Sequence, residues 1–363
     1  MLSASLIAKL RASPLGFGGA PLGNLFRPVS DEAAVALVDH AYSAGVRYFD
    51  TAPHYGHGRS ERRIGDALRA KARDDYLLST KVGRLLEPRA GAPRDQHGYV
   101  DTLPFVQRYD YSAEGVRRSL ADSLQRLGLA RVDIVYVHDI DRDTHGEAHA
   151  RRLADTLEGG LPALAELKGE GRIEGCGLGV NEVAICRQVL AYADLDVILL
   201  AGRYTLADQS ALAELLPECE RRGVAIVLGG PFNSGILATG ARPADGSLPC
   251  FNYAPAPPEI IARVAAIERA CAEFAVPLQA AALQFPVAHP AVASVIPGTR
   301  SVAEFDANLR MLRHPIPREF WSALRERALV DPRAPLPGDS PSPQPSPRTR
   351  GEGARSAGKG PVQ

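Results

Sequence analysis

Short runs of β-branched and other apolar residues alternate along the chain with longer stretches in which apolar residues recur every three or four positions. A short continuous apolar run indicates a strand that is buried on both faces, and the longer spacing indicates an amphipathic helix. Eight candidate strands follow, at residues 14–17, 47–50, 76–81, 133–138, 174–180, 196–200, 225–228 and 294–296. The helix-like stretches lie at residues 31–44, 61–70, 113–127, 162–168, 211–221, 259–274 and 303–312. This alternation favours an α/β fold with a parallel sheet.

Two α/β folds fit such a pattern, the (β/α)8 barrel and the open, doubly wound sheet. An open dinucleotide-binding sheet carries a Gly-x-Gly-x-x-Gly motif between its first strand and first helix. The corresponding segment, Gly16-Phe17-Gly18-Gly19, is too short and is followed by Pro21. We therefore expect a (β/α)8 or TIM barrel that occupies residues 1–331 of the 363-residue chain as one domain.

Two segments fall outside the alternation. Residues 84–111 form a long loop after the third strand that is rich in charge, Pro and Gly, and such loops are usually functional or disordered. Its aromatic residues predict a packed flap near the barrel mouth; they are Tyr99, Phe105, Tyr109 and Tyr111. Residues 332–363 are rich in Pro, Ser, Gly and Arg with almost no apolar side chains, which predicts a disordered low-complexity tail.

Charge and composition disfavour several classes of partner. The 42 basic and 42 acidic residues cancel, so the chain has no net field to attract a nucleic acid or an anionic membrane. The longest apolar runs are strand-sized and the N-terminus lacks a convincing secretion signal. Five widely spaced cysteines without a CxxC pair indicate reduced, mostly buried thiols. We expect a cytoplasmic protein that acts on a small molecule.

Three consecutive apolar strands each end in an ionisable residue, namely Asp50, Lys81 and His138, and Tyr55 follows Asp50 by five residues. Reactive groups of a parallel barrel collect at these carboxyl ends. Each residue alone has an ordinary explanation: a helix cap, a solvated rim charge, or a packed side chain that bonds to the backbone. The coincidence of four such groups at one rim favours a catalytic set.

The chemistry of a tyrosine beside a lysine gives this set a function. A phenol has a reference pKa of about 10 and exchanges protons poorly at neutral pH. Lys81 would favour the phenolate and so lower the pKa of Tyr55, while Asp50 would keep the lysine charged and aimed. His138 would orient the substrate by a hydrogen bond. Such a tyrosine can take a proton from an alcohol as a hydride leaves for a nicotinamide, or return one in reverse.

The segments around these residues resemble the aldo-keto reductase family. Residues 45–68, GVRYFDTAPHYGHGRSERRIGDAL, are similar to the family signature, STKVGR (79–84) to its catalytic-lysine strand, and DIVYVHDID (133–141) to the strand that ends in its histidine. GLGVNE (177–182) and SVIPGTRSVAEFDANL (294–309) match its cofactor segments. The resemblance covers roughly residues 14–312. It implies an NAD(P)-dependent barrel, a monomer or weak homo-oligomer, with the same four catalytic residues.

Within the family, residues 109–141, 199–206 and 227–237 resemble the branch that holds D-threo-aldose (L-fucose) 1-dehydrogenases and pyridoxal 4-dehydrogenases. This likeness implies an aldose 1-dehydrogenase that oxidises the anomeric hydroxyl of a sugar to a lactone, with Tyr55 as general base. Pyridoxal 4-dehydrogenase and general aldehyde or ketone reductase are alternatives on the same fold. A non-catalytic nucleotide-binding subunit is an alternative of another class.

The resemblance also implies the cofactor-binding residues: Gly19, Asn181, Gly229, Gly230, Asn233, Ser234, Gly235, Gly298, Thr299, Arg300, Glu304 and Asn308. The glycine-rich loop after the seventh strand would expose backbone N–H groups to a pyrophosphate. Gly298 and Glu304 stand where NADP-preferring relatives carry a Lys and an Arg. Because a carboxylate repels the 2′-phosphate, we expect NAD, with NADP possible through Arg300. Where many relatives stack a Tyr on the nicotinamide this chain has Gly229, and Phe232 is the substitute we consider.

His54 and Asp139 stand beside catalytic positions and are weaker candidates for binding substrate hydroxyls, with solvated loop residues as the ordinary alternative. The other histidines considered for a metal, His57, His145 and His149, do not have the spacing of a zinc motif. We therefore expect no metal.

Overall fold

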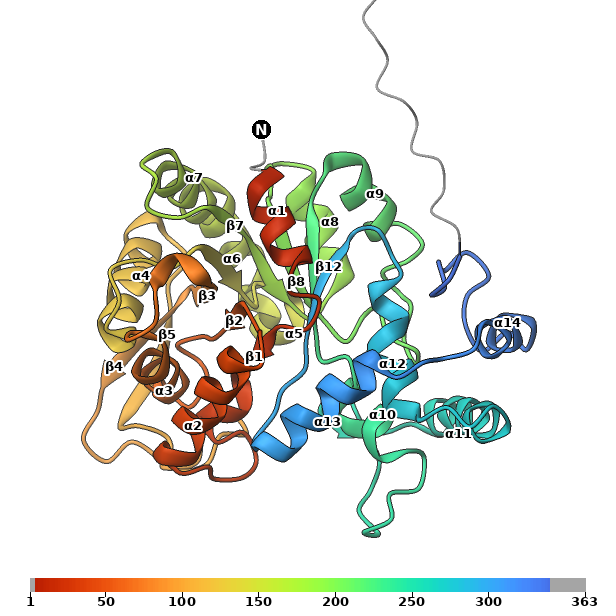
Figure 1. Ribbon diagram of the computed structural model, residues 1–363. Helices are drawn as coiled ribbons and strands as arrows, with labels where there is room; N and C mark the ends of the chain where they lie inside the picture. The colour runs from red at the N-terminus through yellow and green to blue at the C-terminus, as the bar shows by residue number, and fades with distance from the viewer. Residues whose placement is uncertain (1–3, 340–363) are drawn as a thin grey trace, which may run out of the picture.

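The computed structural model describes residues 4–339, which form a barrel of eight parallel strands surrounded by helices (Figure 1). In spatial order the strands are β1 (Phe17–Gly18), β2 (Tyr48–Asp50), β3 (Leu77–Val82), β6 (Ile134–His138), β7 (Gly175–Val180), β8 (Val197–Ala201), β9 (Ala225–Gly229) and β12 (Val292–Ile296). The sheet closes because Gly16 N donates to Val295 O at 2.9 Å and Val295 N donates to Pro14 O at 2.9 Å. The predicted (β/α)8 barrel is confirmed, and every predicted strand overlaps an observed one or, at residues 14–17, this closing segment.

Alternate residues of a strand point into and out of the barrel. In β6, Ile134 and Tyr136 belong to the inner apolar cluster, whereas Val135 and Val137 pack outward under the helices. Both faces of the strand are therefore buried. This double burial is why the strands of a parallel barrel read as continuous apolar runs in the sequence.

The helices lie around the outside of the barrel or close its ends. They are α1 (Ala4–Arg11), α2 (Asp31–Ser43), α3 (Arg59–Leu68), α4 (Ala113–Leu127), α5 (Arg142–His145), α6 (His149–Asp155), α7 (Leu161–Gly169), α8 (Val183–Leu190), α9 (Leu215–Arg222), α10 (Ile236–Thr239), α11 (Pro258–Glu273), α12 (Leu278–Val287), α13 (Val302–Arg313) and α14 (Arg318–Glu326). Ser30 and Ser112 cap α2 and α4 by accepting a hydrogen bond from a first-turn N–H. Gly223 ends α9 in the left-handed conformation.

Helix α1 lies across the amino end of the barrel, at the top of Figure 1. Its Leu6 and Leu10 join the inner apolar cluster, which includes Tyr48, Leu77 and Ile134 of three barrel strands. The amino end of the barrel is therefore sealed by apolar packing, and the carboxyl end is left for a functional site.

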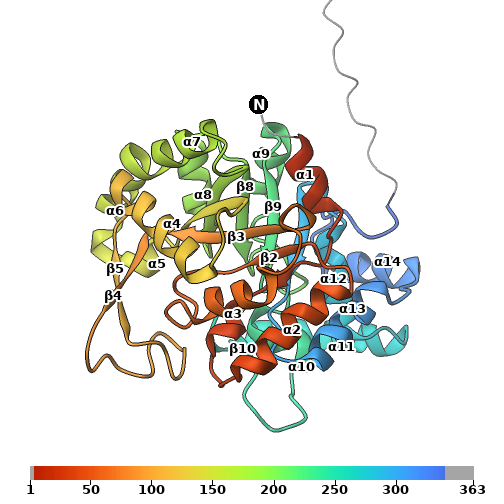
Figure 2. The ribbon, with the colours of Figure 1, turned by 60° about the vertical axis from the view of Figure 1, so that its left-hand side comes forward.

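The long insertion after the third barrel strand, residues 84–111, contains an antiparallel hairpin rather than an irregular loop. Its strands are β4 (Arg84–Pro88) and β5 (Phe105–Tyr109), and the chain between them extends beside the barrel mouth (Figure 2). Tyr99 and Tyr111 of this insertion are buried, which confirms a packed flap. A second, shorter hairpin joins β10 (Cys250–Phe251) to β11 (Ala254–Pro255).

The packed chain continues past the boundary predicted at residue 331. Ala334 and Leu336 are buried, Arg325 of α14 donates to Ala334 O at 3.0 Å, and Arg318 donates to Gly338 O at 2.6 Å. Residues 332–339 therefore belong to the folded domain, because two arginines and two apolar side chains fasten them to α14 and its surroundings. The rest of the predicted tail, residues 340–363, lies outside the described residues. Within residues 4–339, no helix combines the length and apolarity needed to cross a membrane.

Candidate active site

The two-residue period of the strands turns Asp50, Lys81 and His138 toward the barrel interior. Tyr48, two residues before Asp50, and Tyr136, two residues before His138, both belong to the inner cluster. Side chains two positions apart on a strand lie on the same face. Because β2 pairs with β3 and β3 with β6, the three ionisable side chains lie on neighbouring strands at one rim, as the sequence predicts.

Lys81 and Asp50 form a buried ion pair at the floor of this rim. Lys81 Nζ lies 2.6 Å from Asp50 Oδ2 and 2.9 Å from the backbone oxygen of Thr51, and neither charged side chain is more than 2% exposed. Burial raises the pKa of Asp50 and lowers the pKa of Lys81, while their mutual attraction opposes both shifts. The contact fixes the direction of the lysine side chain.

Hydrogen bonds inside the barrel hold Asp50 in turn. Ser79 Oγ donates to Asp50 Oδ1 at 2.7 Å and lies 3.0 Å from the hydroxyl of Tyr48. That hydroxyl lies 3.0 Å from the hydroxyl of Tyr136. The carboxylate is therefore satisfied on one oxygen by a serine and on the other by the lysine, which leaves it no freedom to rotate.

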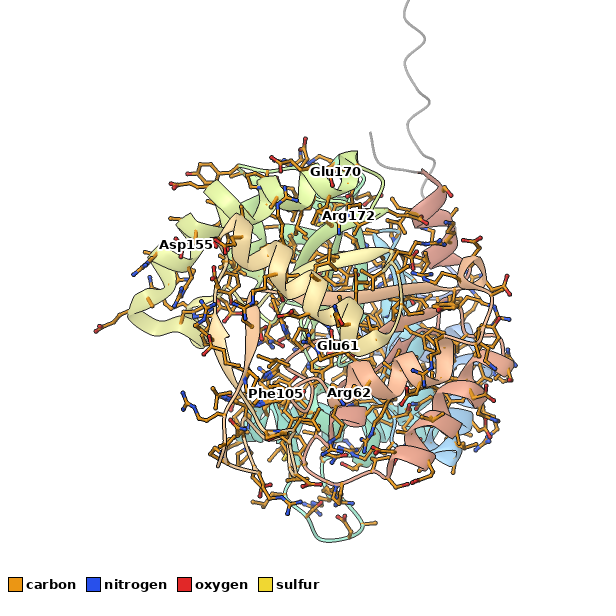
Figure 3. All side chains as sticks on the ribbon, turned by 90° about the vertical axis from the view of Figure 1, so that its left-hand side faces the viewer. Glu61, Arg62, Phe105, Asp155, Glu170 and Arg172 are labelled. Carbon is orange, nitrogen blue, oxygen red and sulfur yellow. The ribbon has the colours of Figure 1, made fainter. Side chains whose placement is uncertain are left out.

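A second polar contact supports β3 from outside the barrel. Glu61 of α3 is fully buried; it accepts a hydrogen bond from Thr80 Oγ1 at 2.7 Å and pairs with Arg126 of α4 at 2.5 Å. Figure 3 shows Glu61 where α3 and α4 meet. Thr80 precedes Lys81, so this contact anchors the strand that carries the lysine.

Tyr55 follows β2 in a tight turn, in which its N–H donates to Ala52 O at 3.1 Å. Lys81 Nζ lies 4.6 Å from the centre of the Tyr55 ring. The expected lowering of the tyrosine pKa is wrong for the protein alone: burial raises the pKa of Tyr55 well above its usual value, and the charge of Asp50 adds to the rise. Asp50 largely neutralises the lysine at 2.6 Å. Tyr55 is therefore an uncharged phenol at neutral pH.

His138 stands opposite Tyr55, with ring centres 6.0 Å apart and ring planes nearly perpendicular. Burial, followed by the positive charges of Arg84 and Lys81, lowers the pKa of His138 well below its usual value, so the imidazole is neutral. Its backbone oxygen accepts a hydrogen bond from the hydroxyl of Tyr111 at 2.8 Å. A neutral imidazole beside a phenol can bind a substrate oxygen without adding charge.

The two weaker substrate candidates, His54 and Asp139, are joined by Arg84 of β4. Arg84 pairs with the Asp139 carboxylate, and its Nη1 lies 3.1 Å from His54 Nδ1. Gln107 of β5 lies 2.7 Å from the same nitrogen. Burial lowers the pKa of His54 well below its usual value and raises the pKa of Asp139 to about 6 against the attraction of Arg84. The hairpin thus supplies two polar residues, Arg84 and Gln107. Neither ends a barrel strand, so the pattern of strand ends in the sequence does not indicate them.

A cavity of about 410 Å³ opens between these side chains, a size that suits a small molecule. Its polar wall consists of His54, Tyr55, Lys81, His138, Asp139 and Asn181. Four aromatic side chains also line it, namely Phe26, His97, Tyr99 and Tyr253, together with small and aliphatic residues that include Leu25, Val180 and Leu199. A larger hollow of about 530 Å³ lies beside α12 and α13, but it contains none of the four predicted catalytic residues. The smaller cavity is therefore the candidate active site.

Two groups of cofactor candidates lie at the ends of β9 and β12, which are neighbours in the barrel. Gly230 and Gly235 adopt left-handed φ values of 56° and 110°, and a Cβ at Gly235 would meet no atom within 4 Å. Thr299 Oγ1 and Arg300 Nε are buried without a hydrogen-bond partner among residues 4–339. Open backbone next to unpartnered polar atoms fits a nucleotide cofactor.

Other cofactor candidates have visible structural roles. A Cβ at Gly19 would stand 2.5 Å from the backbone oxygen of Asp50, so this glycine allows a close approach to β2. Asn233 Nδ2 donates to Gly202 O at 2.9 Å and ties together the loops after β8 and β9. Ser234 Oγ accepts from the N–H of Tyr253 at 2.9 Å. Gly229 is buried at the end of β9.

The remaining candidates surround the start of α13 or the cavity. Glu304 accepts from the N–H of Arg300 at 2.8 Å, Asn308 is half-buried on α13, and Gly298 is exposed after β12. Asn181 lies in the cavity wall with its Nδ2 3.4 Å from Asp139 Oδ1. Phe232 packs against the outer core and does not line the cavity, which counts against it as a stacking partner.

Comparisons with known proteins show the family and the fold of the chain. Residues 14–328 match the aldo/keto reductase family. The chain is 47% identical over 332 residues to a pyridoxal 4-dehydrogenase from Microbacterium luteolum, covering 88% of this chain and 95% of that protein. It is 39% identical over 333 residues to a D-threo-aldose 1-dehydrogenase from Pseudomonas sp, covering 90% and 97%. The aldo-keto reductase AKR11C1 from Bacillus halodurans has the same fold, with a TM-score of 0.67 at 24% identity over 90% of this chain and 94% of that one.

Proposed function

The chain belongs to the aldo/keto reductase family, and we propose that it is an NAD(P)-dependent aldose 1-dehydrogenase that oxidises the anomeric hydroxyl of a free sugar to a lactone. The observation that carries this proposal is the polar wall of the cavity. Besides Tyr55, it holds four groups that can bind hydroxyls: His54, His138, Asp139 and Asn181. A sugar has a hydroxyl on nearly every carbon and can satisfy them, whereas an apolar aldehyde would leave buried polar groups unpaired.

Tyr55 accepts the proton of the anomeric hydroxyl in this reaction, and bound NAD(P) supplies the hydride acceptor. Tyr55 must therefore be a phenolate in the oxidative direction, and Lys81 at 4.6 Å from its ring centre is the cation that stabilises that form. His138 holds the reacting oxygen. In the reductive direction the neutral phenol that burial favours is already the proton donor.

NAD is the cofactor that we propose for this reaction. Glu304 at the start of α13 accepts from the N–H of Arg300 at 2.8 Å, so its negative charge stays where NADP-preferring relatives carry a basic side chain that binds the 2′-phosphate. Repulsion between the two charges favours the cofactor without that phosphate. The ratio of kcat/KM for NAD to that for NADP tests this, with a value above one expected and a value below one contradicting it.

Pyridoxal oxidation is the second candidate, and the 47% identity to a pyridoxal 4-dehydrogenase favours it. Pyridoxal also forms a ring hemiacetal, so the same proton and hydride transfers would give a lactone. The aromatic side chains Phe26 and Tyr253 beside the cavity suit its flat ring.

One assay separates these candidates. NADH formation is followed with L-fucose, D-arabinose, L-galactose, other free aldoses and pyridoxal. We expect the highest kcat/KM with an aldose. A clear preference for pyridoxal would replace the first proposal by the second, and the absence of turnover with both substrate types would overturn both.

A further inference from the structure

Two polar groups beside Tyr55 take no part in the proton transfer proposed above. His54 lies with its ring centre 6.2 Å from that of Tyr55 and 5.7 Å from that of His138, and Asp139 follows His138 in the chain. Both line the cavity, and both are held by Arg84. Their arrangement defines what kind of substrate group they can bind.

The hydrogen bonds of Gln107 determine the tautomer of His54. Gln107 Oε1 accepts from Arg84 Nη1 at 3.0 Å, so its Nε2 is the end of the amide that faces His54 Nδ1 at 2.7 Å. An amide nitrogen only donates, and the guanidinium of Arg84 only donates as well. His54 Nδ1 is therefore an acceptor, and its single proton is on Nε2. Among residues 4–339 no hydrogen bond of this Nε2 is found, and His54 lines the cavity, so a substrate oxygen can accept from it.

Asp139 supplies the complementary acceptor. Its Oδ2 is bound by Arg84 and lies 3.3 Å from His138 Nε2, and its Oδ1 has a long contact of 3.4 Å to Asn181 Nδ2. The residue has a φ of 44°, an unusual backbone conformation for a residue with a side chain. Its N–H donates to Gly179 O at 3.0 Å, and its backbone oxygen accepts from the hydroxyl of Tyr111 at 3.1 Å. Arg84 is itself only 5% exposed on its side chain and stacks on the ring of Tyr109 at 5.1 Å, so its guanidinium has a fixed position.

We propose that His54 Nε2–H and the Asp139 carboxylate together bind a hydroxyl on the carbon next to the reacting carbon, and that Arg84 and Gln107 position this pair. A hydroxyl donates one hydrogen bond and accepts others, so one donor and one acceptor satisfy it. The substrates selected are 2-hydroxy aldehydes and aldoses with a free 2-hydroxyl. This inference rests on the proposed function for the reaction itself and names the substrate class that the site selects.

The first test compares two aldehydes that differ by this hydroxyl alone. Reduction of 2-hydroxypropanal and of propanal by NADH is measured, and the ratio of their kcat/KM values is the readout. We expect the protein to prefer 2-hydroxypropanal by roughly 10- to 100-fold, the effect of one or two hydrogen bonds to a partly charged site. In His54→Phe and Asp139→Leu this ratio falls toward one, mainly by loss of activity on the hydroxylated aldehyde. An unchanged ratio in both variants would overturn the proposal.

Gln107→Glu tests the positioning role without changing the shape of the side chain. A carboxylate accepts a hydrogen bond, so the single proton of the neutral His54 ring moves from Nε2 to Nδ1. Nε2 then no longer donates, and the ratio falls. The matched control is Gln96→Glu, because Gln96 Nε2 lies 3.3 Å from Nδ1 of His57, a histidine of the same region that does not line the cavity. The control keeps the wild-type ratio if the Gln107 effect is specific. An equal fall of the kcat/KM ratio in the two variants would mean that these glutamines only support the structure, and it would contradict the proposal.

The ¹⁵N chemical shifts of the His54 imidazole give a readout that does not depend on turnover. A neutral ring protonated on Nε2 is expected in the wild-type protein, and a neutral ring protonated on Nδ1 in Gln107→Glu. A wild-type ring protonated on Nδ1 would overturn the proposal. Absence of turnover with every aldose and pyridoxal, combined with an intact aldehyde ratio, would count against the proposed function alone.

Discussion

Lys81 and Asp50 stabilise each other, because both charges are buried and each is the main partner of the other. Asp50→Asn or Lys81→Met leaves one charge buried without compensation, which destabilises the fold by about 3–5 kcal/mol. The double variant removes both charges, so its loss of stability is smaller than the sum of the two single losses. All three variants lose activity, because the phenolate of Tyr55 then lacks an oriented cation.

Urea unfolding of the four proteins measures these free energies. Ser210→Ala, a change at an exposed loop position, serves as the control and leaves the free energy of unfolding nearly unchanged. Strictly additive losses in the double variant would contradict the coupling of the two charges.

The raised pKa of Tyr55 gives the two reaction directions opposite dependences on pH. Below that pKa the phenolate is the minor form, and its fraction grows as the pH rises. The kcat/KM for oxidation therefore increases by about tenfold per pH unit from about pH 7 upward, until the pKa is passed. Reduction uses the phenol and stays level over the same range. Initial rates in both directions across this range check the prediction, and an oxidation rate that is level or falls toward alkaline pH would contradict it.

At the scale of elements, the β10–β11 hairpin and the segment before α2 each place one aromatic residue beside the cavity. Tyr253 is 66% exposed and Phe26 56% exposed, and both have left-handed φ values, of 62° and 61°. Asn252 and Tyr253 form the two-residue turn between β10 and β11, and such turns require left-handed φ values, so the hairpin accounts for this conformation of Tyr253. Both aromatic residues line the cavity. They lie where a substrate ring would enter.

Tyr253→Ala is therefore expected to raise the KM for the substrate by about three- to tenfold with little change in kcat, because one aromatic contact is lost. Tyr192→Ala is the matched control, since Tyr192 is 78% exposed after α8 and does not line the cavity. Steady-state kinetics of the two variants give the comparison. A Tyr253→Ala protein with a normal KM and a reduced kcat would assign the tyrosine to the chemical step instead.

At the scale of the whole molecule, the barrel could be predicted because its strands are buried on both faces and stand out as apolar runs. The meeting of Asp50, Lys81 and His138 at one rim could be predicted for the same reason, because these residues end the apolar runs. Helix α1 could not be predicted, because it has only eight residues and its burial depends on the barrel end that it covers. The β4–β5 hairpin was hidden in a polar insertion, where no strand has a continuous apolar face.

The rest of the site depends on contacts that the linear sequence does not contain. Arg84 and Gln107 meet His54 only because the hairpin folds back over the rim. The sequence predicts a lowered pKa for Tyr55, because it shows which charges lie nearby but not how deeply the phenol is buried, and this burial raises the pKa. Gly19 resembles a cofactor residue in sequence, whereas its visible role is a close approach to β2.

We propose that Tyr55 exchanges the proton in a hydride-transfer reaction, and the variant Tyr55→Phe tests this role. This variant removes one hydroxyl and keeps the ring that Lys81 faces. We predict that kcat falls by roughly 10²–10⁴-fold, while the dissociation constant for NAD(P)H, measured by fluorescence titration, changes little. A Tyr55→Phe protein that keeps most of its kcat would show that Tyr55 does not exchange the proton.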